Sequence, residues 1–235
     1  MFKLLQEDVK RFGFKKANGQ ANPNAFFNQI LPNLLSYRVQ KRSRLRQYMS
    51  KNFKHCIKKE YQDDVLSILD DLFDYVYFDD INESYHNKTI HLRLNKWNML
   101  RMESFFDELD EFGEKRTSYL RNLLNEYTKM RQDERESICF ADQHERIWVA
   151  METRTFVTCK YMGVENRMCP LAFEVGPDGY LYVLAMSEDA EFLFEPIRLS
   201  FIEKVKNLDD IPPVAYALWK SARTKACSTF ECDHN

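Results

Sequence analysis

The spacing of apolar residues divides the chain into a first half that predicts helices and a second half that predicts strands. Up to about residue 136, apolar side chains recur at every third or fourth position, as on one face of a helix. Beyond residue 154, four short runs rich in β-branched and aromatic residues are separated by turn residues: Thr155–Tyr161, Arg167–Val175, Gly179–Met186 and Phe192–Val205. We therefore expect an α+β fold in which a helical region precedes a small antiparallel barrel or strongly bent sheet.

The last run contains an arginine inside an alternating stretch. Alternation places Arg198 and Ser200 on one face of the predicted strand and the apolar side chains of Ile197, Leu199 and Phe201 on the other. We expect the apolar face to fill the core and Arg198 to point into a groove, so that removing its side chain leaves stability nearly unchanged. The alternative is a buried arginine that only satisfies backbone carbonyls.

The helical half contains an internal repeat. Residues 24–34 align with residues 117–127, and each copy begins with a predicted N-cap residue, Asn24 or Thr117. Each copy also follows a Phe-Gly pair, at 12–13 and 112–113, that ends an earlier amphipathic helix. Only the second copy is preceded by a predicted strand.

That strand, Thr89–Asn95, alternates without interruption and is followed by predicted helices at 96–110 and 118–132. This order resembles the ribbon-helix-helix fold, in which two copies pair their strands into a ribbon that enters the DNA major groove. The resemblance implies base-facing roles for the residues Thr89, His91 and Arg93. It also implies that the first turn of the second helix, at Thr117 and Ser118, contacts a phosphate. The alternative is an exposed Arg93 that is only solvated.

Charge is segregated although the net charge of the 235-residue chain is only −2. Residues 38–59 hold nine Lys or Arg and no acidic residue, whereas residues 60–83 hold nine Asp or Glu and no Lys or Arg. The helix that begins near residue 24 is expected to continue into the basic stretch, whose candidate phosphate contacts are Arg38, Lys41, Arg42, Arg44 and Arg46. The alternative is a solvated face neutralised by the acidic helix that follows.

Several functional classes lack support in the sequence. No apolar run approaches the roughly 20 residues that cross a bilayer, and the N-terminus lacks a signal-peptide core, so we expect a cytoplasmic protein without a membrane partner. No phosphate-binding glycine loop, metalloprotease motif or nucleophile elbow is present, so we expect no enzyme. The scattered cysteines predict neither a metal site nor a cofactor.

The strand-rich half resembles the WYL domain, a small barrel with an Sm-like or SH3-like strand order. Four motifs carry the resemblance, which covers about a quarter of the chain: Val157–Tyr161, Cys169–Leu171, Gly179–Ala185 and Ile197–Ile202. The family's namesake triplet falls on Leu181-Tyr182-Val183, where only the tyrosine is kept, and a second family arginine falls on Phe201. The resemblance implies a site for a small anionic or nucleotide ligand or for nucleic acid, built from Tyr161, Tyr182 and Arg198, with Lys160 and Arg167 adding charge.

Two functions follow from these resemblances. One is a DNA-binding transcriptional regulator whose WYL domain senses a ligand. The other is a single-stranded-RNA-binding accessory protein that modulates an RNA-guided ribonuclease, because Phe12-Gly13-Phe14 and the spacing Asn22–Asn28 resemble the accessory proteins of type VI-D CRISPR systems. Either protein would be a homodimer through its ribbon. The predicted domains are 1–83 (helical, with a strandless repeat), 84–136 (ribbon-helix-helix), 137–211 (barrel) and 212–235 (tail).

Overall fold

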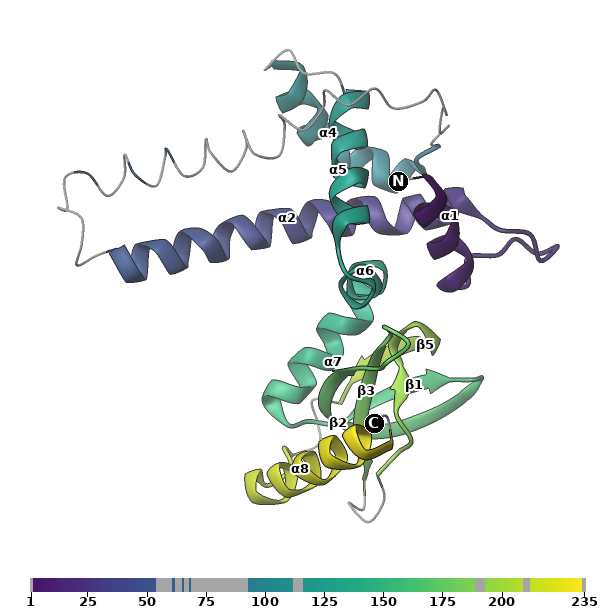
Figure 1. The fold of residues 1–235 in the computed structure, drawn as a ribbon, viewed down its shortest axis with the longest axis vertical. Coiled ribbons are helices and arrows are strands. Elements are labelled where there is room, and N and C mark those ends of the chain that lie inside the picture. Colours follow the sequence, from purple (N-terminus) through teal and green to yellow (C-terminus); the bar gives the residue numbers. More distant parts are fainter. Residues whose placement is uncertain are drawn as a thin grey trace. The chain divides into compact units, whose positions relative to one another are not determined.

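A computed structural model describes residues 2–53, 61, 65, 68, 93–111, 116–188, 193–208 and 212–233. The backbone contacts divide the chain into unit 1, residues 1–129, and unit 2, residues 130–235. Unit 1 is helical where it is described, and unit 2 combines helices with an antiparallel sheet, so the predicted α+β class is confirmed (Figure 1).

The described part of unit 1 consists of α1 (Phe2–Arg11), α2 (Pro23–Phe53), α4 (Lys96–Glu111) and α5 (Arg116–Lys129). Helix α1 packs on α2, α2 on α4, and α4 on α5. The core contains side chains from each of these helices that are at most 2% exposed, among them Leu5, Phe26, Ile30, Met102 and Tyr127. The helices predicted on both sides of each Phe-Gly pair are therefore present, and α2 continues into the basic stretch as predicted, as far as Phe53.

The starts of α2 and α5 differ from the prediction. Asn22 caps α2, since its Oδ1 accepts the Ala25 N–H at 3.1 Å, and Pro23 occupies the first helical position, where no N–H is needed. The N-cap assignment of Asn24 is therefore wrong, because Asn24 already lies in the first turn. Helix α5 begins at Arg116, so Thr117 lies inside the helix instead of capping it.

Asparagine side chains of α2 hold the segment that leads into α4. The Arg93 N–H donates to Asn24 Oδ1 at 3.0 Å, and Asn28 Nδ2 donates to the Arg93 carbonyl at 2.9 Å. Asn28 Oδ1 also accepts the Asn95 N–H at 2.8 Å. The predicted strand therefore does not extend over residues 93–95, whose backbone groups bind side chains of a helix. The rest of that strand, residues 89–92, lies outside the described residues.

Unit 2 begins with α6 (Gln132–Cys139) and α7 (Ala141–Thr153), which the sequence interpretation did not predict. The strands that follow are β1 (Val157–Tyr161), β2 (Val164–Val175), β3 (Leu181–Ser187), β4 (Ile197–Arg198) and β5 (Ile202–Asn207). The first three coincide with three predicted runs. The fourth run is interrupted by a short 3-10 helix, η3 (Leu199–Phe201), that separates β4 from β5.

The strands of unit 2 form one antiparallel sheet in the order β4-β3-β2-β1-β5. Within the described ranges β4 and β5 lie at opposite edges, so the sheet is not closed into a barrel by strand pairing. A register shift near Pro170 interrupts the ladder between β2 and β3, which is where a residue without an N–H is tolerated in an inner strand.

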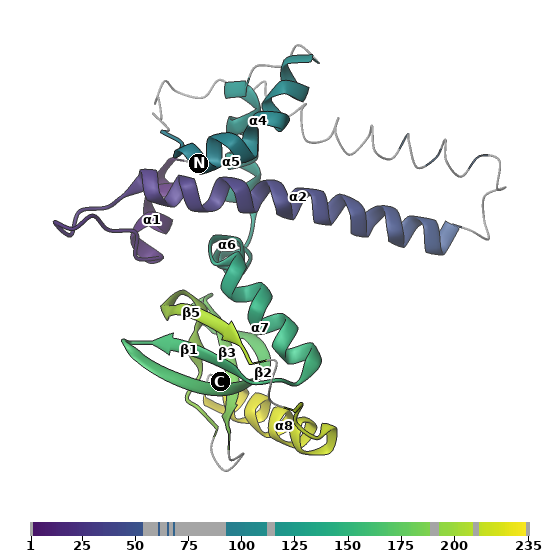
Figure 2. The ribbon, with the colours of Figure 1, turned by 180° about the vertical axis from the view of Figure 1, so that it is seen from behind.

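Alternating side chains of the sheet build two cores, one against α7 and one against α8 (Tyr216–Asp233). Figures 1 and 2 show both helices beside the sheet. On β3, Leu181, Val183 and Ala185 pack toward α7, whereas Leu184 and Met186 pack toward α8. Unit 2 is therefore a three-layer arrangement of helix, sheet and helix.

Helix α8 stands where the sequence interpretation expected only a tail. Its Trp219, Ala226 and Phe230 side chains are no more than 8% exposed and lie in the core on this face of the sheet. Trp219 Nε1 also donates to the Pro170 carbonyl at 3.1 Å. The spacing of these residues, seven and then four, is that of one helical face, which the polar composition of the segment obscured.

Candidate nucleic-acid interface

Arg198, the centre of the predicted sheet site, lies in a largely buried position. Its side chain is 12% exposed, and its Nε lies 3.5 Å from Oε1 of Glu136, which is fully buried. The guanidinium carbon lies 3.0 Å from the centre of the Tyr180 ring and 4.8 Å from that of Phe201. The structure therefore does not place Arg198 in an open groove, because η3 breaks the strand alternation and a carboxylate from α6 neutralises its charge.

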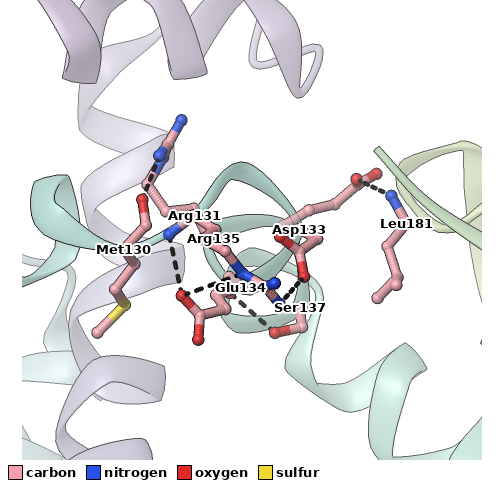
Figure 3. A network of polar contacts seen from close by, with 8 residues as sticks. Met130, Arg131, Asp133, Glu134, Arg135, Ser137 and Leu181 are labelled. Carbon is pink, nitrogen blue, oxygen red and sulfur yellow. Dashed lines mark hydrogen bonds and ion pairs between the residues drawn. The ribbon is translucent and has the colours of Figure 1, made fainter. Parts of the chain in front are cut away.

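Glu136 connects α6 to the sheet through each of its carboxylate oxygens. Oε2 accepts the Leu181 N–H at 2.8 Å, at the dashed line beside Leu181 in Figure 3, and Oε1 accepts the Ser200 N–H at 3.0 Å. Burial raises the pKa of this carboxyl, while the Leu181 N–H and the charge of Arg198 act more weakly in the opposite direction. Glu136 thus fixes the start of β3 and the turn after β4 with one side chain.

A local polar network holds the first turn of α6 (Figure 3). The Glu134 carboxylate accepts the Arg131 N–H at 2.9 Å just before the helix begins. Arg131 also pairs with Asp133 at 2.8 Å, and Arg135 donates to the Met130 carbonyl. Anionic side chains in the first turn suit the positive end of the helix dipole. The network is therefore structural.

The two predicted ligand-binding tyrosines face opposite sides of the sheet. Tyr161 packs against the core under α7, whereas Tyr182 packs against the core under α8. The Tyr182 hydroxyl donates to Asp178 at 2.7 Å, and burial together with this contact raises the pKa of Tyr182 to about 12. Of these two tyrosines, Tyr182 is the cross-strand neighbour of Arg198. The structure therefore does not assemble the predicted trio in one place.

The two cations expected to strengthen this site form exposed ion pairs instead. Lys160 lies 2.8 Å from Glu203, and Arg167 lies 2.8 Å from Glu188. Both side chains are more than 40% exposed. Ligand binding by these residues stays a prediction, since their positions show no shared anion site.

The basic half of α2 is the more open of the predicted surfaces. The side chains of Lys41 and Arg44 are exposed, and that of Arg38 is half-buried, with its Nη1 donating to the Tyr119 hydroxyl at 3.3 Å. Arg42 and Arg46 lie on the same helix, and their side chains lie outside the described set. This segment is helical, as predicted from the sequence, and the helix exposes part of its positive charge to solvent.

The predicted ribbon site is only partly visible. Thr89 and His91 lie outside the described residues, and Arg93 is exposed, with its backbone held by Asn24 and Asn28. Thr117 is exposed and Ser118 half-buried in the first turn of α5, about where a phosphate-contacting turn was predicted. Their contact with a phosphate stays a prediction.

The sequence interpretation did not identify Glu136 or the tyrosines of α2 as residues of a site. Glu136 could not be identified, because a single carboxylate in a polar run gives no sign of a partner 62 positions away. Tyr37 and Tyr48 could have been identified, because Tyr37 borders the basic stretch and Tyr48 lies within it, about three helical turns away. Aromatic side chains interleaved with cations are typical of surfaces that bind single-stranded nucleic acid.

The described residues form neither a metal site nor a membrane span. In the part of the chain that the structure describes, three or more His, Cys, Asp or Glu side chains do not gather at any point that could hold a metal ion. None of the described helices is long and apolar enough to cross a membrane.

No protein-family model matches this sequence, and no curated protein matches it. A solved structure described as a crystal structure of a CRISPR Cas-related protein is similar in fold, with a TM-score of 0.62 and 11% sequence identity. The match covers 97% of this chain and 67% of that chain. At this identity the similarity shows the fold alone, and it extends over both units.

Proposed function

We propose that this chain is a non-catalytic accessory protein that binds single-stranded RNA and acts beside an RNA-guided CRISPR ribonuclease. The observation that carries the proposal is the fold match to a CRISPR Cas-related protein over 97% of the chain. The N-terminal motif resemblance supports the same association. Its phenylalanines and asparagines lie in the core and at the helix contacts of unit 1, since Phe26 is 0% exposed and Asn28 holds the segment before α4.

Single-stranded RNA is favoured over duplex DNA because the structure describes the basic surface of α2 but no strand at the end of the predicted DNA-binding ribbon. The exposed cations of α2 offer phosphate contacts that need no particular base. A DNA ribbon would need its strand to present Thr89, His91 and Arg93 together, and the described end of that segment is not a strand. A DNA-binding transcriptional regulator is therefore the second candidate.

The finer interpretation of unit 2 is a WYL-type domain with an Sm-like or SH3-like strand order. The strand order with β1 beside β5 and the short η3 between β4 and β5 support it. Here the family's arginine position, Arg198, would stabilise the domain through Glu136. A small anionic or nucleotide ligand would then need to compete with this carboxylate.

A homodimer remains part of the proposal. It rests on the resemblance to the ribbon-helix-helix fold alone, because asparagines of α2 already bond backbone groups of Arg93 and Asn95. The mass of the full chain in solution, measured by light scattering at micromolar concentration, tests this. A monomeric mass would contradict it.

The test of the proposed ligand is a direct comparison of affinities at one salt concentration. Fluorescence anisotropy of labelled single-stranded RNA and of a DNA duplex of equal length should give the lower Kd for RNA. Tighter binding of the duplex would favour the regulator, and absence of binding to either would refute a nucleic-acid function. Fixed salt is essential, because the phosphate contribution changes steeply with ionic strength.

A further inference from the structure

The second half of α2 carries aromatic and basic side chains along a single face. Tyr37, Lys41, Arg44, Tyr48 and Lys51, which we call the α2 stripe, follow one another at spacings of four, three, four and three residues. Residues three and four apart lie on the same side of a helix. At 1.5 Å per residue, the stripe is about 21 Å long.

Most side chains of the α2 stripe are exposed, and three of them carry positive charge. Tyr48 is 63% exposed, and the side chains of Lys41, Arg44 and Lys51 are all exposed. Tyr37 is half-buried, and the Lys41 ammonium lies 5.9 Å from the centre of its ring. The sequence holds no acidic residue between 38 and 59 that could neutralise this face within the helix.

We propose that the α2 stripe is a binding surface for single-stranded nucleic acid. The tyrosines stack on unpaired bases, and the cations hold the phosphates between them. A length of about 21 Å corresponds to roughly six nucleotides at about 3.4 Å per phosphate of a stacked strand. This inference rests on the proposed function and gives it a location and a mode of recognition.

Other occupants fit the stripe less well. Its spacing is also that of a coiled-coil seam, but three of its five side chains are Lys or Arg, and burying them against an apolar helix is unfavourable. Duplex DNA offers its phosphates but keeps its bases stacked on one another, so Tyr48 would gain nothing from it. Unpaired bases on a phosphate backbone use both kinds of side chain.

The test uses the full chain with variants that separate stacking from charge. Tyr48→Ala removes a ring, Tyr48→Phe keeps it without the hydroxyl, and the double variant Lys41→Gln/Arg44→Gln removes two cations. Tyr216→Ala is the matched control, because Tyr216 is 58% exposed on α8 and also has cations beside its ring. Circular dichroism checks that each variant is folded. The probes are labelled 12-nucleotide single-stranded RNA, single-stranded DNA and a 12-base-pair duplex, titrated at several salt concentrations.

Stacking predicts that Tyr48→Ala raises the Kd for single strands by about fivefold to 100-fold without changing the salt slope. Tyr48→Phe and Tyr216→Ala should bind like the wild type. The double variant should reduce the slope of log Kd against log salt by about 1.4, from about 0.7 per phosphate contact on a single strand. The single strand that binds more tightly, RNA or DNA, identifies the source of the ligand.

Failure of the stripe can be distinguished from failure of the proposed function. If the wild type binds single strands and Tyr48→Ala and the double variant bind equally well, the stripe is not the site and the proposed function stands. Equal losses on the duplex, or an equal loss with Tyr216→Ala, would also overturn the stripe. If the wild type binds no single strand at low salt, both proposals are wrong.

Discussion

Removing the side chain of Arg198 should destabilise unit 2, in contrast to the expectation from strand alternation. Arg198→Ala would leave the fully buried Glu136 carboxylate with backbone N–H donors but without its cation. Removing one partner from a buried ion pair typically lowers the free energy of unfolding by about 3–5 kcal/mol. Because Arg198 is 12% exposed and its Nε lies 3.5 Å from the carboxylate, we expect the lower end, about 3 kcal/mol.

The assay is urea denaturation followed by circular dichroism, with Arg167→Ala as the control. Arg167 lies closer to its partner, 2.8 Å from Glu188, but both side chains are about half exposed, so its loss should change stability by less than about 1 kcal/mol. The double-mutant cycle of Arg198→Met with Glu136→Gln should give a coupling energy of about 1–3 kcal/mol. An Arg198→Ala variant within about 0.5 kcal/mol of the wild type would refute this reasoning and restore the open-groove interpretation.

Two further predictions concern stability. Asn28→Ala removes the amide that bonds the backbone of residues 93 and 95 and should lower the free energy of unfolding by about 1–3 kcal/mol, measured by urea denaturation. Asn18→Ala, in an exposed loop, is the control, and equal effects would contradict the role of Asn28. Burial lowers the pKa of His144, which stacks on Phe173, so the folded state favours the neutral imidazole. The stability that this preference contributes is fully present above pH 6.5 and is lost as the pH falls through the lowered pKa. His144→Phe should therefore lose less stability than the wild type between pH 7.5 and 5, and parallel profiles would contradict this.

The parts of the fold that were predicted depend on short-range patterns. The run of β-branched and aromatic residues between turn residues identified β3, because a strand of this composition packs on both faces, with Leu181 and Val183 on one side and Leu184 on the other. The spacing around the Phe-Gly pairs likewise identified the helices of unit 1, because local amphipathicity decides which face is buried.

The parts that were missed depend on contacts between distant residues. The strand predicted through Asn95 is not present at residues 93–95 because Asn28, 67 positions away, takes the Asn95 N–H. The surroundings of Arg198 were missed for the same reason, since they are determined by Glu136 on a helix that was not predicted. Tertiary hydrogen bonds to a carboxylate or an amide leave no periodic trace in the sequence.

Photocrosslinking tests most directly whether α2, and not the sheet around Arg198, holds the nucleic acid. The full chain would be irradiated with single-stranded RNA that carries 5-iodouridine, and the crosslinked peptides would be mapped by mass spectrometry. The account predicts crosslinks to residues 37–51, chiefly at Tyr48, which is 63% exposed, and their loss in Tyr48→Ala. Crosslinks confined to the sheet at Tyr161, Tyr182 or the turn after Arg198 would contradict it.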